Sequence, residues 1–201
     1  MGLLSGTASF TRFTVEGEVP ENFWDFVAQR VAEHSFQDID ETIDEYSIGW
    51  VSVADMFDSG FAFGSYAAGD YVVLSMRMDE RKVAPAVLKK FIAKEESRIR
   101  QEKGLRRLSR SVRLEIKERL RAELVRKSPA IPAVYDLCWN TSDNTLLFFS
   151  NSRKAIALLE DLFRETFDLS LVMQIPWNTA LQLSDQAAAD KLADLQPALL
   201  I

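Results

Sequence analysis

The chain has 201 residues, 47% of them hydrophobic and 27% charged, and its formal net charge at pH 7 is −6. This length and composition support a buried core without a metal ion or a disulfide, and the single cysteine, Cys138, excludes an intramolecular disulfide. No stretch approaches the ~20 apolar residues of a membrane span, and the N-terminus lacks the pattern of an export signal. We therefore expect one cytoplasmic domain over residues 1–201, with no membrane association.

The first elements in chain order are expected to be strands around one helix. The β-forming residues at 9–15 predict a strand. A helix is expected from Pro20 to about His34, because apolar residues recur there every four positions. Two more strands are expected at 47–51 and 71–76, and the stretch rich in Gly and Phe between them, 56–69, is expected to form a loop or hairpin.

Two consecutive helices are expected next. Pro85 suits the start of a helix over residues 85–103, and Gly104 suits its C-cap. Ser109 is a good N-cap for a second helix that runs to Lys127, where Ser128-Pro129 stops it.

The last third returns to strands. Strands are expected at 133–139 and 145–149, followed by a helix at 152–167, a strand at 169–175 and a short terminal helix at 184–195. Strand pairs joined by short turns favour an antiparallel sheet. The expected fold is therefore α+β, with a largely antiparallel sheet body (1–80 and 133–201) and a projecting basic αα-hairpin arm (about 81–132).

The positive charge is concentrated in the two consecutive helices. Residues 77–127 contain 18 of the 24 Lys and Arg but only 8 of the 30 Asp and Glu. The rest of the chain is strongly acidic, so the overall pI of 5.0 conceals a basic segment. Such a segment favours an anionic partner, and duplex DNA is the first candidate. The alternatives are a protein-interaction module whose arm grips an acidic partner and a merely solvated amphipathic hairpin.

Spacing within the helices suggests how they pack and what they present. Apolar stripes run along both helices, at Leu88, Ile92 and Ile99 in the first and at Leu108, Val112, Ile116, Leu120 and Leu124 in the second. We expect these stripes to pair the helices while the basic stripes face outward together. The expected phosphate contacts are Lys90, Lys94, Arg98, Arg106, Arg110, Arg113, Lys117 and Arg121. The basic stripes hold no Asn or Gln to read base edges, so binding is expected to be non-specific.

No catalytic site is expected. His34 is the only histidine, so neither a His/Cys metal site nor a histidine-based triad has its members. A cluster of carboxylates has the composition of a Mg²⁺ site, but a solvated acidic loop is the favoured interpretation; its members are Glu33, Asp38, Asp40, Glu41, Asp44 and Glu45. We expect no enzyme activity, no metal and no cofactor.

Several short segments, in their order, resemble the RdgC family of recombination-associated DNA-binding proteins of bacteria. They are Ile48-Gly49-Trp50-Val51, Arg81-Lys82-Val83-Ala84-Pro85-Ala86-Val87, Trp139, Leu146-Leu147-Phe148, Ser152 and the helix beginning at Ala155. The likeness extends from about residue 10 to residue 183.

This resemblance implies a nucleoid-associated protein that binds duplex DNA with little sequence preference. It also implies a head-to-head dimeric ring with a basic lining, and restraint of the RecA recombinase through occupation of the DNA. Longer family members continue past the position of Ile201, and that portion helps to build their ring. The resemblance therefore does not decide whether this chain forms a closed ring. The turn expected at 129–132 aligns with a tip where the family places an aromatic dimer contact. Either Ile131 replaces that contact or it is lost.

Overall fold

The body of the protein is one antiparallel sheet, seen in a computed structural model that describes residues 2–4, 6, 8–183 and 191. The strand order is β2-β4-β5-β6-β1-β7, with the short β3 beside β4, and every ladder is antiparallel as predicted. The strands are β1 (Thr11–Glu16), β2 (Tyr46–Val51), β3 (Ala67–Ala68), β4 (Tyr71–Arg81), β5 (Ala130–Asn140), β6 (Thr145–Phe148) and β7 (Ser170–Met173). The fold class, α+β, is confirmed.

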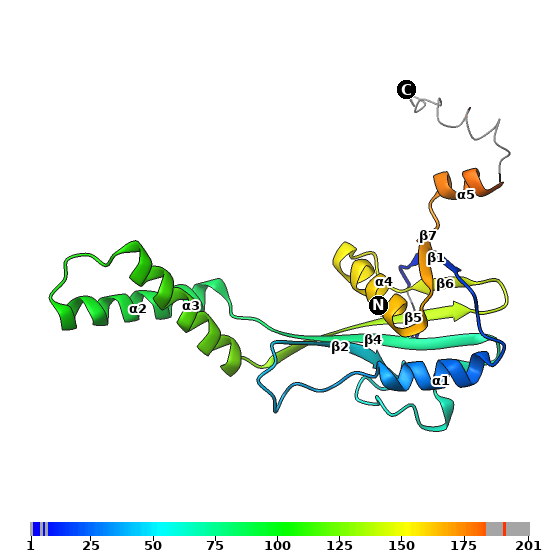
Figure 1. Cartoon of the computed structure of the whole chain (residues 1–201), viewed down its shortest axis with the longest axis horizontal. Coiled ribbons are helices and arrows are strands. Elements are labelled where there is room, and N and C mark those ends of the chain that lie inside the picture. Colours follow the sequence, from blue (N-terminus) through cyan, green and yellow to red (C-terminus); the bar gives the residue numbers. More distant parts are fainter. Residues whose placement is uncertain (1, 5, 7, 184–190, 192–201) are drawn as a thin grey trace.

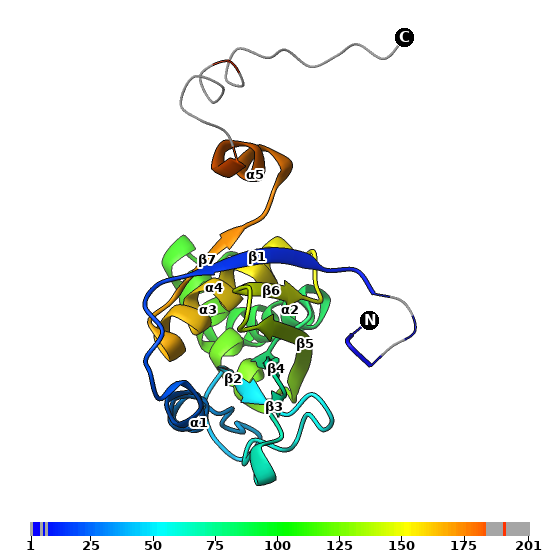
Figure 2. The ribbon, with the colours of Figure 1, turned by 90° about the vertical axis from the view of Figure 1, so that its right-hand side faces the viewer.

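Two helices cover one face of the sheet and close the core. Helix α1 (Phe23–Glu33) contributes Val27 and Val31, and α4 (Arg153–Phe167) contributes Leu159 and Phe163, all at most 1% exposed. Seen along the strands, the sheet curves from β1 round to β2 with α4 on its concave side (Figure 2). The buried Trp50 indole donates a hydrogen bond to the Thr166 hydroxyl at 2.8 Å, which ties the edge strand β2 to α4.

The longest ladder, between β4 and β5, carries the chain out of the body. It pairs all eleven residues of each strand, from Tyr71 opposite Asn140 to Arg81 opposite Ala130. Strand β4 was expected to end at residue 76, where charged residues begin. It continues because Arg77 and Asp79 point to one face of the sheet, both are buried, and they bond each other at 2.6 and 2.8 Å.

Beyond the ends of β4 and β5, helices α2 (Pro85–Lys103) and α3 (Arg110–Lys127) pack against each other, away from the sheet (Figure 1). Their bounds match the prediction: Gly104 caps α2 with φ +62°, and the Ser109 hydroxyl accepts from Val112 N. The predicted apolar stripes pair the helices, because Leu108, Ile116 and Leu120 are buried against Leu88, Ile92, Ile99 and Val112. We call residues 85–127 the arm.

The bounds of several other helices and loops differ from the prediction. Helix α1 begins at Phe23 rather than at Pro20, the 56–69 stretch contains a short 3₁₀ helix (η1, Ala62–Gly64), and α5 (Pro176–Leu183) was not predicted. The helix predicted at 184–195 falls outside the described residues, apart from residue 191. The predicted turn at 129–132 is wrong: β5 begins at Ala130, and Ile131 pairs with Glu80 at the root of the arm, not at its tip.

Candidate nucleic-acid interface

The two long sides of the arm differ in charge. Residues 94 and 98 of α2 lie on one side of that helix, and residues 96 and 100 lie on the opposite side, because successive residues turn by about 100°. Helix α3 follows the same division: its Arg119 contacts Glu95 of α2, whereas its Arg113 lies beside Glu96. The arm therefore has two faces that can be compared.

The first face, which we call the paired face, carries a group of ion pairs centred on Glu95. The Glu95 carboxylate accepts from Arg98 at 2.8 Å and from Arg119 at 2.7 Å, and Arg98 also donates to Glu102 at 2.7 Å. The hydrogen bond from Arg98, followed by the one from Arg119, lowers the pKa of Glu95 to about 2. Glu95 is therefore ionised at neutral pH, and these guanidinium groups are already engaged.

The second face, which we call the basic face, has no such ion pairs among the described residues. Its cations are Arg100, Arg106, Arg107, Arg110, Arg113 and Lys117, set around two adjoining depressions that share Glu96 and Arg113. One depression, of about 240 Å³, lies at the arm tip and the other, of about 410 Å³, lies along the middle of the two helices. In the part of the chain that the structure describes, no carboxylate lies within 4.0 Å of any of these six cations.

The residues predicted to contact phosphates do not all lie on the same face of the arm. Arg106, Arg110, Arg113 and Lys117 lie together on the basic face. Lys94 and Arg98 line a depression with Glu95 on the paired face, and Lys90 stands one helical turn before Lys94. The expectation that the two basic stripes face outward together is therefore wrong. The reason is that Leu88, Ile92 and Ile99 fix the rotation of α2, and this rotation turns residues 90, 94 and 98 away from Arg113.

Two residues of the basic face, Arg100 and Arg107, were missed in the sequence. Arg100 adjoins the tip loop, where Leu105 N bonds to its carbonyl oxygen at 3.0 Å, and the buried Leu108 anchors the other end of that loop. The available signal was the density of arginine on both sides of Gly104, which is compatible with a tight helix–helix turn.

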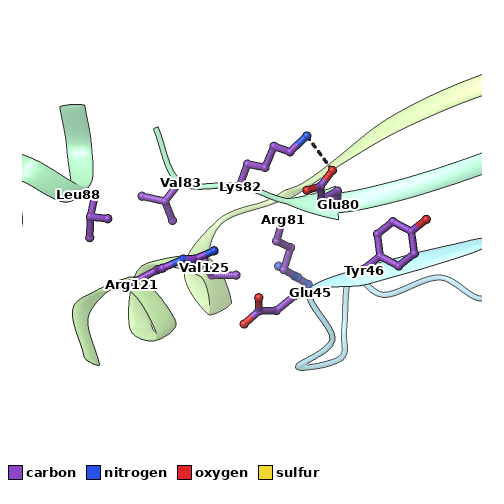
Figure 3. Close-up of a pocket in the computed structure, with 9 residues that line it drawn as sticks. All are labelled: Glu45, Tyr46, Glu80, Arg81, Lys82, Val83, Leu88, Arg121 and Val125. Atoms are coloured by element: carbon purple, nitrogen blue, oxygen red, sulfur yellow. Dashed lines mark ion pairs between the residues drawn. The ribbon is translucent and has the colours of Figure 1, made fainter. Parts of the chain in front are cut away.

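At the root of the arm, Arg121 lies apart from the basic face. It lines a depression of about 400 Å³ together with Glu45, Tyr46 and Glu80 of the body (Figure 3). In the same place the buried Arg81 donates to the backbone oxygens of Ile39, Asp40, Asp44 and Ser128. Arg81 thereby joins β4, the acidic loop and the end of α3.

The comparison with protein families was decisive for the identity of the chain. A family model described as "Putative exonuclease, RdgC" matches residues 12–186. The match covers most of the 201 residues, including the whole arm and its root. The chain belongs to the RdgC family. No curated protein matches it. Among the described helices of this RdgC-family protein, none is long and apolar enough to cross a membrane.

Two carboxylates in the acidic loop of this RdgC-family protein accept hydrogen bonds from within the loop. Asp38 accepts from Asp40 N at 2.7 Å, and Asp44 accepts from the Thr42 hydroxyl at 2.9 Å. Within the described ranges, no group of three or more His, Cys, Asp or Glu side chains is placed to hold a metal ion. His34 is the C-cap residue of α1. Burial raises the pKa of the Cys138 thiol, so the reactive thiolate form of Cys138 is disfavoured.

Proposed function

We propose that this RdgC-family protein binds duplex DNA without sequence preference through the basic face of its arm, and that it influences homologous recombination by limiting the access of a recombinase such as RecA. The observation that carries the proposal is the set of six cations on one face, none with a carboxylate partner among the described residues. A cation without an intramolecular partner is available to a phosphate at little cost. Membership of the RdgC family supports the same reading.

The dimensions of the basic face suit a duplex backbone. On α3 the basic face runs from Arg110 to Lys117, which corresponds to about 12 Å of helix. Duplex DNA carries one negative charge per ~1.7 Å of its axis, so this part of the face runs beside about seven phosphate charges, or roughly four base pairs. Contacts of this kind go to phosphates and carry no base information, which is why we expect no sequence preference.

Two triple variants with equal charge loss test the proposal. Arg110→Ala, Arg113→Ala and Lys117→Ala together remove three charges from the basic face. Lys90→Ala, Lys94→Ala and Arg98→Ala together remove three from the paired face. We expect the first variant to weaken binding of a 20-base-pair duplex by about a hundredfold, and the second by less than about threefold. Fluorescence anisotropy with two duplexes of unrelated sequence measures both effects; an equal loss in the two variants would argue against the basic face.

An acidic protein partner is a second candidate function. Leu114 is 53% exposed among Arg110, Arg113 and Lys117, and apolar area beside arginine is typical of protein interfaces. Leu114→Ala separates the two candidates, because an aliphatic side chain contributes little to phosphate contacts. Unchanged DNA affinity in this variant supports the DNA proposal, and loss of a co-purifying acidic partner supports the second.

We also propose that the chain does not cleave DNA, although the family description names an exonuclease. The local hydrogen bonds of Asp38 and Asp44 support this, because those oxygens are engaged within the loop. Purified protein incubated with linear duplex and Mg²⁺ or Mn²⁺ should leave the DNA intact. Digestion by the wild type that Asp40→Ala abolishes would show the opposite.

A further inference from the structure

The tip of the arm holds the densest cluster of like charge along the basic face. Four arginines from three segments line the tip depression of about 240 Å³: Arg100 from α2, Arg106 and Arg107 from the loop, and Arg113 from α3. Among the described residues, Glu96 is the only acidic one in the lining, and its carboxylate makes no ion pair with these arginines. The depression therefore carries a surplus of about three positive charges.

The surroundings hold these arginines in place. The Arg100 guanidinium donates through Nε to the Glu96 backbone oxygen at 3.1 Å, which fixes the plane of the group and leaves its outer N–H groups available. The loop is pinned by Gly104 in the left-handed region and by Leu108, which is 8% exposed. Helix α3 begins at the rim with no acidic residue in its first turn, so its N-terminal dipole adds positive potential.

This arrangement is unfavourable without a counter-charge. Like charges held close together destabilise the folded chain, and here the carboxylate of Glu96 in the lining makes no ion pair with the arginines. An anion whose charges lie close together would relieve them most, because several arginines converge on one concave place. Duplex phosphodiesters have one charge each and are spread along a convex surface, so they match the middle of the basic face better than the tip.

We propose that the tip depression binds a di- or triphosphate group, such as inorganic pyrophosphate or the phosphate chain of a free nucleotide. Among the described residues no aromatic side chain lines the depression, so we expect the number of phosphates, rather than the base, to decide affinity. Arg113 belongs to both depressions. A bound polyphosphate therefore competes with duplex DNA, and this consequence alone rests on the proposed function.

Pyrophosphate binding to the whole chain tests the proposal without DNA. Calorimetry and thermal unfolding are carried out in a magnesium-free buffer at constant ionic strength, since Mg²⁺ would neutralise the ligand. We expect pyrophosphate to bind at least about tenfold more tightly than inorganic phosphate and to raise the melting temperature. The double variant Arg100→Gln, Arg107→Gln should lose at least about tenfold in affinity. The control Arg126→Gln, with the same type of change at the other end of α3, should stay within about twofold of wild type.

The ligand series identifies the source of the phosphates. Equal affinity for pyrophosphate and for ADP and GDP, with weaker binding of AMP, supports a site that reads phosphate number alone. Equal affinity for phosphate and pyrophosphate, or an unchanged double variant whose circular dichroism shows a normal fold, would overturn the proposal. Pyrophosphate that binds at the tip without displacing duplex DNA supports the tip site and counts against the DNA-binding face instead.

Discussion

Arg81 is the side chain that fastens the arm to the body. It is only 9% exposed, and its guanidinium donates to five backbone oxygens, four from the acidic loop and one from Ser128, the residue after α3. An arginine presents five N–H donors in one plane, which lets a single residue serve this many acceptors. One guanidinium therefore links the end of α3 to the acidic loop of the body.

Replacement of Arg81 by Ala should destabilise the protein. The change leaves backbone oxygens in the root without their donor, so we expect a loss of about 3 kcal/mol in the free energy of unfolding. The matched control is Lys82→Ala, whose exposed side chain makes a surface ion pair with Glu80 and should cost less than about 1 kcal/mol. Urea unfolding measures both, and equal losses would contradict the role given to Arg81.

The two arm helices are joined by an ion pair as well as by their apolar stripes. Glu95 of α2 reaches Arg119 of α3, 24 residues away in sequence. Its pKa is lowered from 4.5 to about 2 in the folded chain, so its contribution to stability is complete above the unfolded pKa. The contribution is lost as the pH falls from about 4.5 through about 2.

Glu95→Gln should therefore show a stability difference that depends on pH. The variant is expected to be less stable than wild type at pH 7 and at pH 5, and the difference should shrink as the pH approaches 2. Chemical unfolding at pH 7, 5 and 3 measures the difference. A deficit that stays constant over this range would show that packing, and not the charge of Glu95, joins the helices.

At the level of elements, capping residues predict the ends of helices better than the positions of charged residues predict the ends of strands. The bounds of α2 and α3 could be predicted because Pro85, Gly104 and Ser109 act within one or two residues of themselves. The end of β4 could not, because the burial of Arg77 depends on its pairing with Asp79 and on the fold around them. The basic face could be predicted only in part. Its α3 residues follow from helical spacing, whereas the contribution of α2 depends on how that helix is rotated against its partner.

The whole molecule presents its basic face from one side only. The arm stands away from the sheet (Figure 1), so a single copy reaches one side of a duplex. We predict that the protein self-associates, most simply as a dimer, so that two arms hold the DNA. Ile131, which is 54% exposed at the arm root, stays the candidate contact. Light scattering at micromolar concentration, with and without duplex DNA, checks this; a monomer mass under both conditions would refute it.

The dependence of DNA affinity on salt tests the central claim most directly. If about six phosphates are neutralised, the logarithm of the association constant should fall with the logarithm of salt concentration at a slope near −5. The basic-face triple variant (Arg110→Ala, Arg113→Ala, Lys117→Ala) should flatten this slope by about three units, one for each lost phosphate contact. The paired-face variant (Lys90→Ala, Lys94→Ala, Arg98→Ala) should keep the wild-type slope. An unchanged slope in a folded basic-face variant would contradict the account and place the DNA elsewhere on the molecule.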